Sequence, residues 1–346
     1  MNIIERVKKL NFPFGEYVII GGGVLDALGI RATNDVDAAV TQKLFKELRA
    51  TGEWEEEAKH GKIFLKRSDV DINPDISWSE YPTTNEEAIS SAIVVDGIPF
   101  MNLEELKRFK LASGREKDIT DIKLIEEYLQ KIKPFINWAE NRLGASVVAI
   151  KEPHGDQSTV YNLIGPNESY FLKIAPKLAE ERERLEWFCG KLSVPKVIGF
   201  THIGDKDVLL LSAIKGTNLA KLKKEWPADK VVNKLAEALL KFHAASAKNC
   251  PFGNPGPNKI LVHGDACLPN FIFQGDEFSG YIDLGDARVD MPEVDLSAAV
   301  WSLQYNLGPG YGLKFLKEYG IKNASEEMAE KLRLHYEEMQ KEWGLT

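Results

Sequence analysis

Three oxygen-bearing side chains between Leu261 and Gly285 have a spacing that suits phosphate chemistry. Asp265 and Asn270 stand in a His-x-Asp-x-x-x-x-Asn pattern, and Asp283 follows in an Asp-x-Gly pattern. In phosphoryl transfer this order supplies a base, a metal-binding amide and a metal-binding acid. Apolar runs at 271–273 and 281–282 flank a turn at 274–280, which predicts a hairpin that carries all three side chains to one edge. The stretch therefore predicts a site for magnesium and phosphate.

A lysine and a glutamate further upstream have the placement needed to hold a nucleotide. Lys173 lies in the β-rich run 170–174, where its ammonium would hold the α- and β-phosphates of a nucleotide. In the helical segment 178–191, Leu185 and Phe188 define the apolar face. Glu181 lies one turn before Leu185 and is expected to point inward. We therefore predict an ion pair between Glu181 and Lys173.

Other parts of the same region predict contacts to the rest of the nucleotide. The loop 153–158, between strands expected at 147–150 and 159–164, has a single glycine, so phosphate contacts would come from backbone N–H groups and Ser158. The β-rich run 208–213 breaks at a Lys-Gly pair, where backbone groups from Ser212 to Ile214 could meet an adenine. Phe171 would supply an aromatic face.

The length, composition and net charge limit which classes of protein and which partners are expected. The length of 346 residues favours more than one domain, and contents of 44% hydrophobic and 28% charged residues are ordinary for a globular protein. The net charge of −8 argues against a nucleic-acid partner. Three cysteines at no metal-ligand spacing indicate a reducing compartment. With no signal peptide and no membrane-spanning apolar run in view, we expect a cytoplasmic protein without a membrane partner, and its oligomeric state is left open.

The first third of the chain contains a second group of acids beside a glycine turn. A β-rich run at 17–20 ends in a triple glycine that includes Gly21 and Gly22, and a helical segment follows. Glycines let backbone approach a phosphate at a helix start. Asp35 and Asp37 lie two apart on the next expected strand and so share a face, and Asp71 lies on a later one. The three acids predict a site for two divalent cations.

This arrangement resembles the nucleotidyltransferase superfamily, whose signature is a Gly-Gly turn, a helix, an Asp-x-Asp pair and a lone acid on a later strand. The stretch LEELKRFKLASGREKDITD at 103–121 is similar to the helix, basic loop and helix of small stand-alone members. The resemblance implies a mixed sheet with helices that binds a nucleoside triphosphate. It makes Arg31, Lys110, Arg115 and Lys117 candidate triphosphate contacts, although a solvated surface explains them equally well.

The predicted domain boundary rests on a proline. The helical pattern of 126–132 is expected to end at Lys133, because the residue before Pro134 is pushed out of the helical region. We therefore divide the chain into residues 1–132, similar to nucleotidyltransferases, an amino-terminal kinase-like lobe at 134–215, and a lobe at 216–346 that carries the catalytic loop.

Five separated blocks in the second part appear in the order typical of one family. The blocks are YFLK, EERERLEWFCGKLSVPKV, DVLLLSAIKGT, LVHGDACLPNFIF and GYIDLGDARVDMPEVDLSAAVW. Together they resemble the aminoglycoside phosphotransferase family, above all its 3′-type members. The resemblance implies a bilobal, protein-kinase-like fold, so that the whole chain would be an α+β protein of two domains.

The resemblance also implies roles for individual residues. Asp265 would be the catalytic base, and Asn270 and Asp283 would bind Mg²⁺. Lys173 and Glu181 would position ATP or GTP, and the acceptor would be a hydroxyl-bearing small molecule. His263 and Asp295 resemble the residues that brace the catalytic loop.

One departure from the family bears on the acceptor. Family members that modify aminoglycosides carry an acidic helical insertion before the catalytic loop, and here only residues 250–259 occupy that place. Glu337, Glu338 and Glu342 of the carboxy-terminal helix could partly replace it, or could be a solvated face.

Three functional hypotheses follow. The first is an ATP-dependent small-molecule kinase fused to a module that could transfer a nucleotidyl group. The second is a regulatory protein that binds nucleotide while one or both modules are inactive. The third is an aminoglycoside-resistance enzyme that uses both halves.

Overall fold

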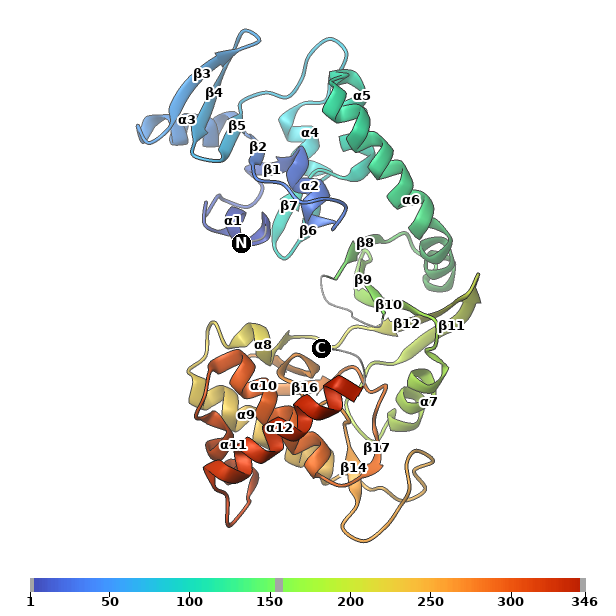
Figure 1. The fold of residues 1–346 in the computed structure, drawn as a ribbon. Coiled ribbons are helices and arrows are strands. Elements are labelled where there is room, and N and C mark those ends of the chain that lie inside the picture. Colours follow the sequence, from blue (N-terminus) through green and yellow to red (C-terminus); the bar gives the residue numbers. More distant parts are fainter. Residues whose placement is uncertain (1–2, 153–157, 343–346) are drawn as a thin grey trace. The chain divides into compact units, whose positions relative to one another are not determined.

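The structure is a computed structural model, which describes residues 3–152 and 158–342 (Figure 1). The chain divides into two compact units. The first comprises Met1–Pro153 with Tyr161–Pro166, and the second comprises His154–Val160 with Asn167–Thr346. Within residues 3–152 and 158–342, none of the helices combines the length and the apolar character needed to cross a membrane.

The first unit is built on a seven-stranded mixed sheet with the order β3-β4-β5-β2-β1-β7-β6. Strand β1 lies between β2 and β7 and is buried along its whole length; it pairs antiparallel with β2 and parallel with β7. The strands are β1 (Tyr17–Ile20), β2 (Val36–Val40), β3 (Glu55–Lys59), β4 (Lys62–Arg67), β5 (Val70–Asn73), β6 (Ile93–Val95) and β7 (Ile98–Phe100).

Six described helices accompany this sheet, and they confirm the predicted order of strand, glycine turn, helix and strand. They are α1 (Ile3–Lys8), α2 (Gly22–Ala27), α3 (Gln42–Ala50), α4 (Asn85–Ser90), α5 (Leu103–Ser113) and α6 (Glu116–Leu143). Helix α2 follows β1 directly through Gly21, whose φ of 63° is a conformation that glycine adopts without strain. The predicted helix, loop and helix at 103–121 are α5 and the start of α6, separated at Gly114.

Helix α6 corrects the prediction that a helix ends at Lys133. It continues through Pro134 to Leu143, where Gly144 caps it with a φ of 68°. A proline inside a helix removes one backbone hydrogen bond, and that cost can be met by packing on either side. Ile132 and Ala139 are both buried, so α6 is held on both sides of the proline. The proline therefore gives no reason to place a domain boundary at this point. The predicted domain ranges stay a prediction.

The second part of the chain begins with a five-stranded sheet of order β11-β12-β10-β9-β8, and β10 pairs antiparallel with β12. The strands are β8 (Val148–Lys151), β9 (Thr159–Ile164), β10 (Ser169–Ala175), β11 (Val197–Ile203) and β12 (Lys206–Ser212). Helix α7 (Ala179–Phe188) follows β10 and precedes β11. The loop predicted to cradle phosphate lies, apart from Ser158, outside the described residues.

The rest of the chain is mainly helical and carries three short antiparallel pairings. The helices are α8 (Leu219–Leu222), α9 (Ala228–His243), the 3₁₀ helix η1 (Leu268–Asn270), α10 (Glu293–Leu307), α11 (Tyr311–Tyr319) and α12 (Glu326–Glu342). The short strands are β13 (Thr217–Asn218), β14 (Ile260–Val262), β15 (Phe271–Gln274), β16 (Glu277–Tyr281) and β17 (Arg288–Asp290). Strands β15 and β16 confirm the predicted hairpin, with a turn shorter than expected because β16 starts at Glu277.

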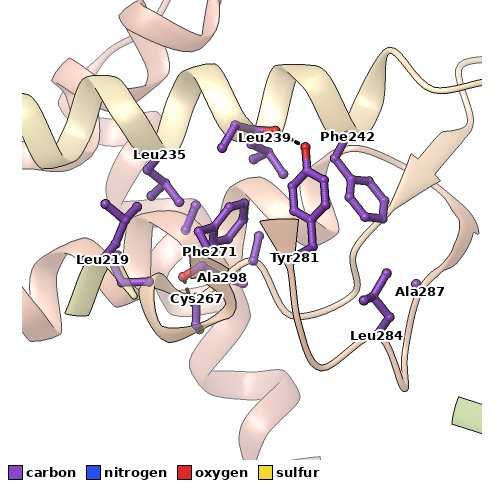
Figure 2. Close-up of a cluster of buried hydrophobic side chains, with 14 of the residues drawn as sticks. Leu219, Leu235, Leu239, Phe242, Cys267, Phe271, Tyr281, Leu284, Ala287 and Ala298 are labelled. Carbon is purple, nitrogen blue, oxygen red and sulfur yellow. Dashed lines mark hydrogen bonds between the residues drawn. The ribbon is translucent and has the colours of Figure 1, made fainter. Parts of the chain in front are cut away.

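A buried cluster fixes this hairpin to α9 (Figure 2). The ring of Tyr281, at the end of β16, packs edge-on to Phe242 of α9, and its hydroxyl donates to the carbonyl of Ala238 at 2.8 Å. Phe271, at the start of β15, lies in the same cluster. Because both ends of the hairpin are buried, the polar residues that flank it are held on a rigid element.

Candidate active site

The predicted pair of Lys173 and Glu181 is present, and Asp283 joins it. Lys173 on β10 places its Nζ 2.8 Å from Glu181 Oε2 on α7. The same Nζ lies 2.8 Å from Asp283 Oδ1, just beyond the end of β16. Lys173 and Glu181 are mostly buried, whereas the Asp283 side chain is 52% exposed. One ammonium thus connects the sheet, α7 and the hairpin.

The electrostatics of this trio favour a bound cation. Burial acts against the charge of Lys173, but the carboxylates of Asp283 and Glu181 outweigh it and raise the pKa of Lys173. The charge of Lys173 lowers the pKa of Asp283, whereas burial raises the pKa of Glu181. Two carboxylates share one ammonium, so an additional positive charge at the exposed Asp283 would be stabilised.

Asp265 is held by hydrogen bonds to both oxygens of its carboxylate. Asn270 Nδ2 donates to Asp265 Oδ2 and to the Asp265 carbonyl, each at 2.9 Å. The hydroxyl of Tyr336 on α12 donates to Asp265 Oδ1 at 3.1 Å. Because the amide nitrogen of Asn270 donates to Asp265, the amide oxygen of Asn270 is the group that can face a metal ion. Oxygens from Asn270 and Asp283 are a donor set that suits Mg²⁺.

A buried carboxylate at the start of α10 braces this loop. Asp295 has no exposed surface, and its carboxylate accepts the backbone N–H groups of His263 at 2.7 Å and Gly264 at 2.8 Å. His243 Nε2 lies 2.8 Å from the same carboxylate. The geometry matches the bracing role predicted for His263 and Asp295, because the ring of His263 also reaches the carbonyl of Ile282 at 3.0 Å, next to Asp283.

The residues predicted to contact the adenine have different surroundings in the structure. The backbone N–H of Ser212 donates to the Lys196 carbonyl at 3.0 Å, and the Ser212 hydroxyl accepts from the backbone N–H of Lys196 at 2.9 Å. Both of these Ser212 groups therefore already have a partner within the protein. Phe171 lies on β10 opposite Leu211 of β12. Ile214 follows β12 and approaches Gly280. Their contact with a nucleotide, like that of Ser158, stays a prediction.

Tyr336 is a site residue that the sequence did not indicate. It is 5% exposed, and its hydroxyl lies 3.6 Å from the buried thiol of Cys267 as well as beside Asp265. Burial, together with the charge of Asp265, raises the pKa of Tyr336, so its hydroxyl keeps the proton that it donates. Tyr336 is far from Asp265 in the chain, and only the packing of α12 brings the two together.

The acidic face expected on α12 is partly neutralised. Arg333 pairs with Glu337 one turn later and with Glu330 at 2.8 Å one turn earlier. Glu338 is exposed, and the side chain of Glu342 lies outside the described residues. The interpretation of this helix as a substitute acidic wall is therefore weakened.

In the first unit, two of the three predicted acids lie side by side. Strands β2 and β5 are parallel, and their register places Asp37 directly opposite Asp71. Asp35 immediately precedes β2 and accepts a hydrogen bond from the Thr33 hydroxyl. A side chain at Gly21 would come within 2.7 Å of Asp37 Oδ2, so the glycine turn lies directly against this carboxylate.

Neighbouring acids change the titration of Asp37. Burial, with the charges of Asp35 and Asp71, raises the pKa of Asp37 to about 6, although Lys117 and Arg115 act in the opposite direction. Over the described part of the chain, no three His, Cys, Asp or Glu side chains are assembled closely enough to hold a metal ion. The three-acid metal site therefore stays a prediction.

Three of the predicted triphosphate contacts are engaged in ion pairs within the first unit. Lys110 is 3% exposed and bridges Asp118 at 2.9 Å and Asp121 at 2.6 Å, so its assignment as a triphosphate contact is wrong. Arg31 also pairs with Asp121, at 2.6 Å, and Arg115 pairs with Asp118 at 2.6 Å. This network ties α5 to the start of α6.

The comparisons with known proteins concern the second part of the chain, from residue 149 onward. The model of the phosphotransferase enzyme family matches residues 149–260 and 254–331, which together are more than half of the chain. The protein therefore belongs to the phosphotransferase enzyme family.

Individual relatives are aminoglycoside 3′-phosphotransferases. The protein of that name from Niallia circulans is 29% identical over 206 residues, which cover 45% of this chain and 79% of the relative. One from Escherichia coli is 24% identical over 239 residues, covering 54% and 84%. Among solved structures, the aminoglycoside-3′-phosphotransferase of type VIII is 22% identical with a TM-score of 0.46, covering 58% of this chain and 97% of that one.

Replacement of Asp295 by alanine tests the brace. Asp295→Ala leaves the buried N–H groups of His263 and Gly264 without their acceptor, so we expect the free energy of unfolding to fall by about 3 kcal/mol. Urea denaturation followed by circular dichroism measures this. Glu293→Ala is the matched control, because Glu293 is an exposed acid on the same helical turn and should change stability by less than about 0.5 kcal/mol. Equal losses in the two variants would contradict the assigned role.

The pKa of Asp37 predicts a pH dependence of stability. Its carboxyl binds a proton more tightly in the folded chain than in the unfolded one, so its contribution to stability falls as the pH rises from about 4 to about 6. Asp37→Asn should therefore be more stable than the natural chain above pH 6, by about 2 kcal/mol, and this gain should shrink toward pH 4. Thermal unfolding in EDTA measures both. Asp96→Asn, at an exposed acid of the same unit, is the control; a gain for Asp37→Asn that does not vary with pH would contradict the expectation.

Proposed function

We propose that the second unit transfers the γ-phosphoryl group of ATP or GTP to a hydroxyl of a small molecule in a magnesium-dependent reaction. The observation that carries this proposal is the convergence of Lys173, Glu181 and Asp283 on one ion-pair cluster, in a member of the phosphotransferase enzyme family. In phosphoryl transfer the protein supplies mainly position and charge.

Each residue has a distinct task in this proposal. The ammonium of Lys173, fixed by Glu181, holds the α- and β-phosphates. Asp265 accepts a hydrogen bond from the acceptor hydroxyl, orients it toward the γ-phosphorus and takes up its proton as the oxygen attacks. The hydrogen bonds from Asn270 and Tyr336 hold the Asp265 carboxylate in place for this step.

The oxygens of Asn270 and Asp283 would hold the magnesium ion. A magnesium ion held there would supply positive charge that offsets the negative charge developing on the phosphate oxygens. Asp283 adopts a φ of 60°, an uncommon conformation for a residue other than glycine, and its pairing with Lys173 restrains it there. The carboxylate is therefore positioned before any ligand arrives.

The relatives indicate which acceptors to test first. They are named aminoglycoside 3′-phosphotransferases, so aminoglycosides are the first compounds to test as phosphate acceptors. Other hydroxylated metabolites are tested next. The alternative is a regulatory protein that binds nucleotide without turnover. The two hypotheses differ in one measurable respect, because only a kinase transfers labelled phosphate to an acceptor.

Replacement of Asp265 by asparagine tests the kinase hypothesis. Asp265→Asn keeps the size of the side chain but removes the proton acceptor, so we expect transfer from labelled ATP to fall at least about 100-fold while Mg·ATP binding changes little. Asp276→Asn is the control, because Asp276 lies in the turn of the same hairpin and pairs with Lys230. Equal turnover of Asp265→Asn and the natural chain would refute the base assignment, and nucleotide binding without phosphate transfer by the natural chain would favour the regulatory alternative.

We further propose that the first unit binds a nucleoside triphosphate with divalent metal and transfers its nucleotidyl group. The parallel pairing of Asp37 with Asp71 and the close approach of Gly21 to Asp37 support this. Asp35, Asp37 and Asp71 would supply the oxygens that hold the metal, and the backbone of the turn at Gly21 and Gly22 would approach a phosphate bound beside them.

A count of bound nucleotides tests the second activity in the full chain. In an Asp265→Asn background, calorimetric titration with Mg²⁺ and a nonhydrolysable ATP analogue should give two sites per chain. Adding Asp35→Ala and Asp37→Ala should reduce the count to one, because the acids that hold the metal are lost. Asp96→Asn in the same background should keep two sites. A count of one before the acids are replaced would refute nucleotide binding by the first unit.

A further inference from the structure

Helix α7 also reaches the segment that follows Asp283, through Arg184. The Arg184 guanidinium donates from Nε to the carbonyl oxygen of Ala287 at 3.0 Å. Ala287 closes a turn that begins directly after Asp283, because its backbone N–H donates to the carbonyl of Leu284 at 3.2 Å. Arg184 therefore holds the far end of a turn whose near end carries the proposed metal ligand.

Glu181 and Arg184 lie three residues apart and share one face of α7. A Cβ atom added at Gly285, in the middle of the turn, would lie 3.8 Å from Glu181 Oε2, so the glutamate lies beside the turn that Arg184 holds. Glu181 also pairs with Lys173, which in turn pairs with Asp283. One face of α7 is thus connected to the Asp283 carboxylate through Lys173, and to the backbone that follows it through Arg184.

The surroundings of Arg184 hold it at this contact. Its side chain is 13% exposed, and its guanidinium lies over the ring of Phe252, 4.9 Å from the ring centroid. The carbonyl of Phe252 accepts the backbone N–H of Val289 at 2.9 Å, which joins this aromatic residue to the same segment. The pairing of Arg184 with Glu180 at 3.1 Å involves a carboxylate that is 83% exposed, so it contributes little. The contacts with Phe252 and Ala287 therefore decide where the guanidinium lies.

The turn needs a restraint of this kind. Asp283 has a φ of 60°, a conformation that costs energy in a residue other than glycine. Its side chain is half-exposed, so packing alone does not fix it. Ala287 is buried, and a buried carbonyl that loses a charged donor is destabilised. Loss of the guanidinium would therefore favour a movement of the turn toward water.

We propose that Arg184 is a positioning residue, which fixes the carboxylate of Asp283 for magnesium and nucleotide. The inference rests on the proposed kinase function and adds to its site a residue that touches neither the nucleotide nor the acceptor. Arg184 acts through the backbone of the turn, whereas Lys173 acts on the carboxylate directly. Without Arg184, the carboxylate would take up more positions and would hold a metal ion less tightly.

Hydrogen exchange of the backbone tests the contact in the full chain without metal or nucleotide. In Arg184→Ala, we expect the amides of residues 284–289 to exchange about tenfold faster than in the natural chain, because the turn loses a restraint. The amides of residues 261–268 should exchange at an unchanged rate, since Asp295 still holds that loop. The measurement is made well below the unfolding temperature of both chains.

Arg182→Ala is the matched control. Arg182 lies on the same helix, its guanidinium lies over the ring of Phe200 at 4.7 Å, and it pairs with Glu183 at 3.3 Å. Its replacement removes the same kinds of interaction and should leave the exchange of residues 284–289 unchanged. Arg184→Lys keeps the charge and a hydrogen-bond donor, so it should restore part of the protection that Arg184→Ala loses.

The magnesium requirement of nucleotide binding tests the positioning itself. A nonhydrolysable ATP analogue is titrated calorimetrically at a series of Mg²⁺ concentrations into full chains that carry Asp35→Ala and Asp37→Ala, so that the proposed site of the first unit does not contribute. Arg184→Ala should raise the Mg²⁺ concentration for half-maximal binding about tenfold, as expected when a residue that orients a metal ligand is lost. Arg182→Ala should leave this concentration unchanged.

Three outcomes would overturn the inference. Exchange of residues 284–289 is as slow in Arg184→Ala as in the natural chain, or the magnesium requirement of that variant is unchanged, or Arg182→Ala alters both measurements as much as Arg184→Ala does.

Transfer from labelled ATP separates this inference from the kinase proposal. If Arg184→Ala changes neither measurement while Asp265→Asn loses phosphate transfer, the positioning role is refuted and the kinase stands. If Arg184→Ala shifts both measurements but the natural chain phosphorylates no acceptor, the kinase proposal fails, and Arg184 still positions Asp283 for the complex of magnesium and nucleotide.

Discussion

The candidate active site depends on the position of one ammonium group. Lys173 Nζ lies 2.8 Å from carboxylate oxygens of both Glu181 and Asp283, residues that come from a helix beside the sheet and from the end of a distant hairpin. Because the lysine is largely buried, losing either partner would leave charge without compensation. The strand, the helix and the hairpin are therefore held in one arrangement, and Asp283 keeps an exposed oxygen where a nucleotide and its metal would bind.

The hairpin needs a second restraint, and the buried carboxylate of Asp295 provides it. By accepting the N–H groups of His263 and Gly264, Asp295 fixes the turn that precedes Asp265. His263 then contacts the carbonyl of Ile282, immediately before Asp283. Asp265, the proposed base, and Asp283, the proposed metal ligand, are thus connected through the backbone on either side of the hairpin, so a shift of one would displace the other.

The sequence predicted the parts of the site that depend on local patterns. The spacing of Asp265 and Asn270, the hairpin that follows and the inward face of Glu181 each depend on a few neighbouring residues, and the structure contains all three. The contacts that sequence reasoning missed join distant segments. Tyr336 reaches Asp265 only because α12 packs on α10, and α6 continues past Pro134 because buried residues on both sides hold it. Amino-acid composition and residue spacing do not indicate such contacts between distant segments.

Helix α10 connects the loop that carries Asp265 to helix α12. Asp295 in its first turn fixes the catalytic loop, while Trp301 and Tyr305 lie toward its other end. Ten residues of helix separate Asp295 from Tyr305, a rise of about 15 Å at roughly 1.5 Å per residue. Because a helix is stiff over this length, the exposed ring is held at a set distance from the base. Tyr336 of α12 packs on Trp301 of α10 and donates to Asp265, so α10 fixes the loop that carries Asp265 at its first turn and positions a partner of the Asp265 carboxylate further along the helix.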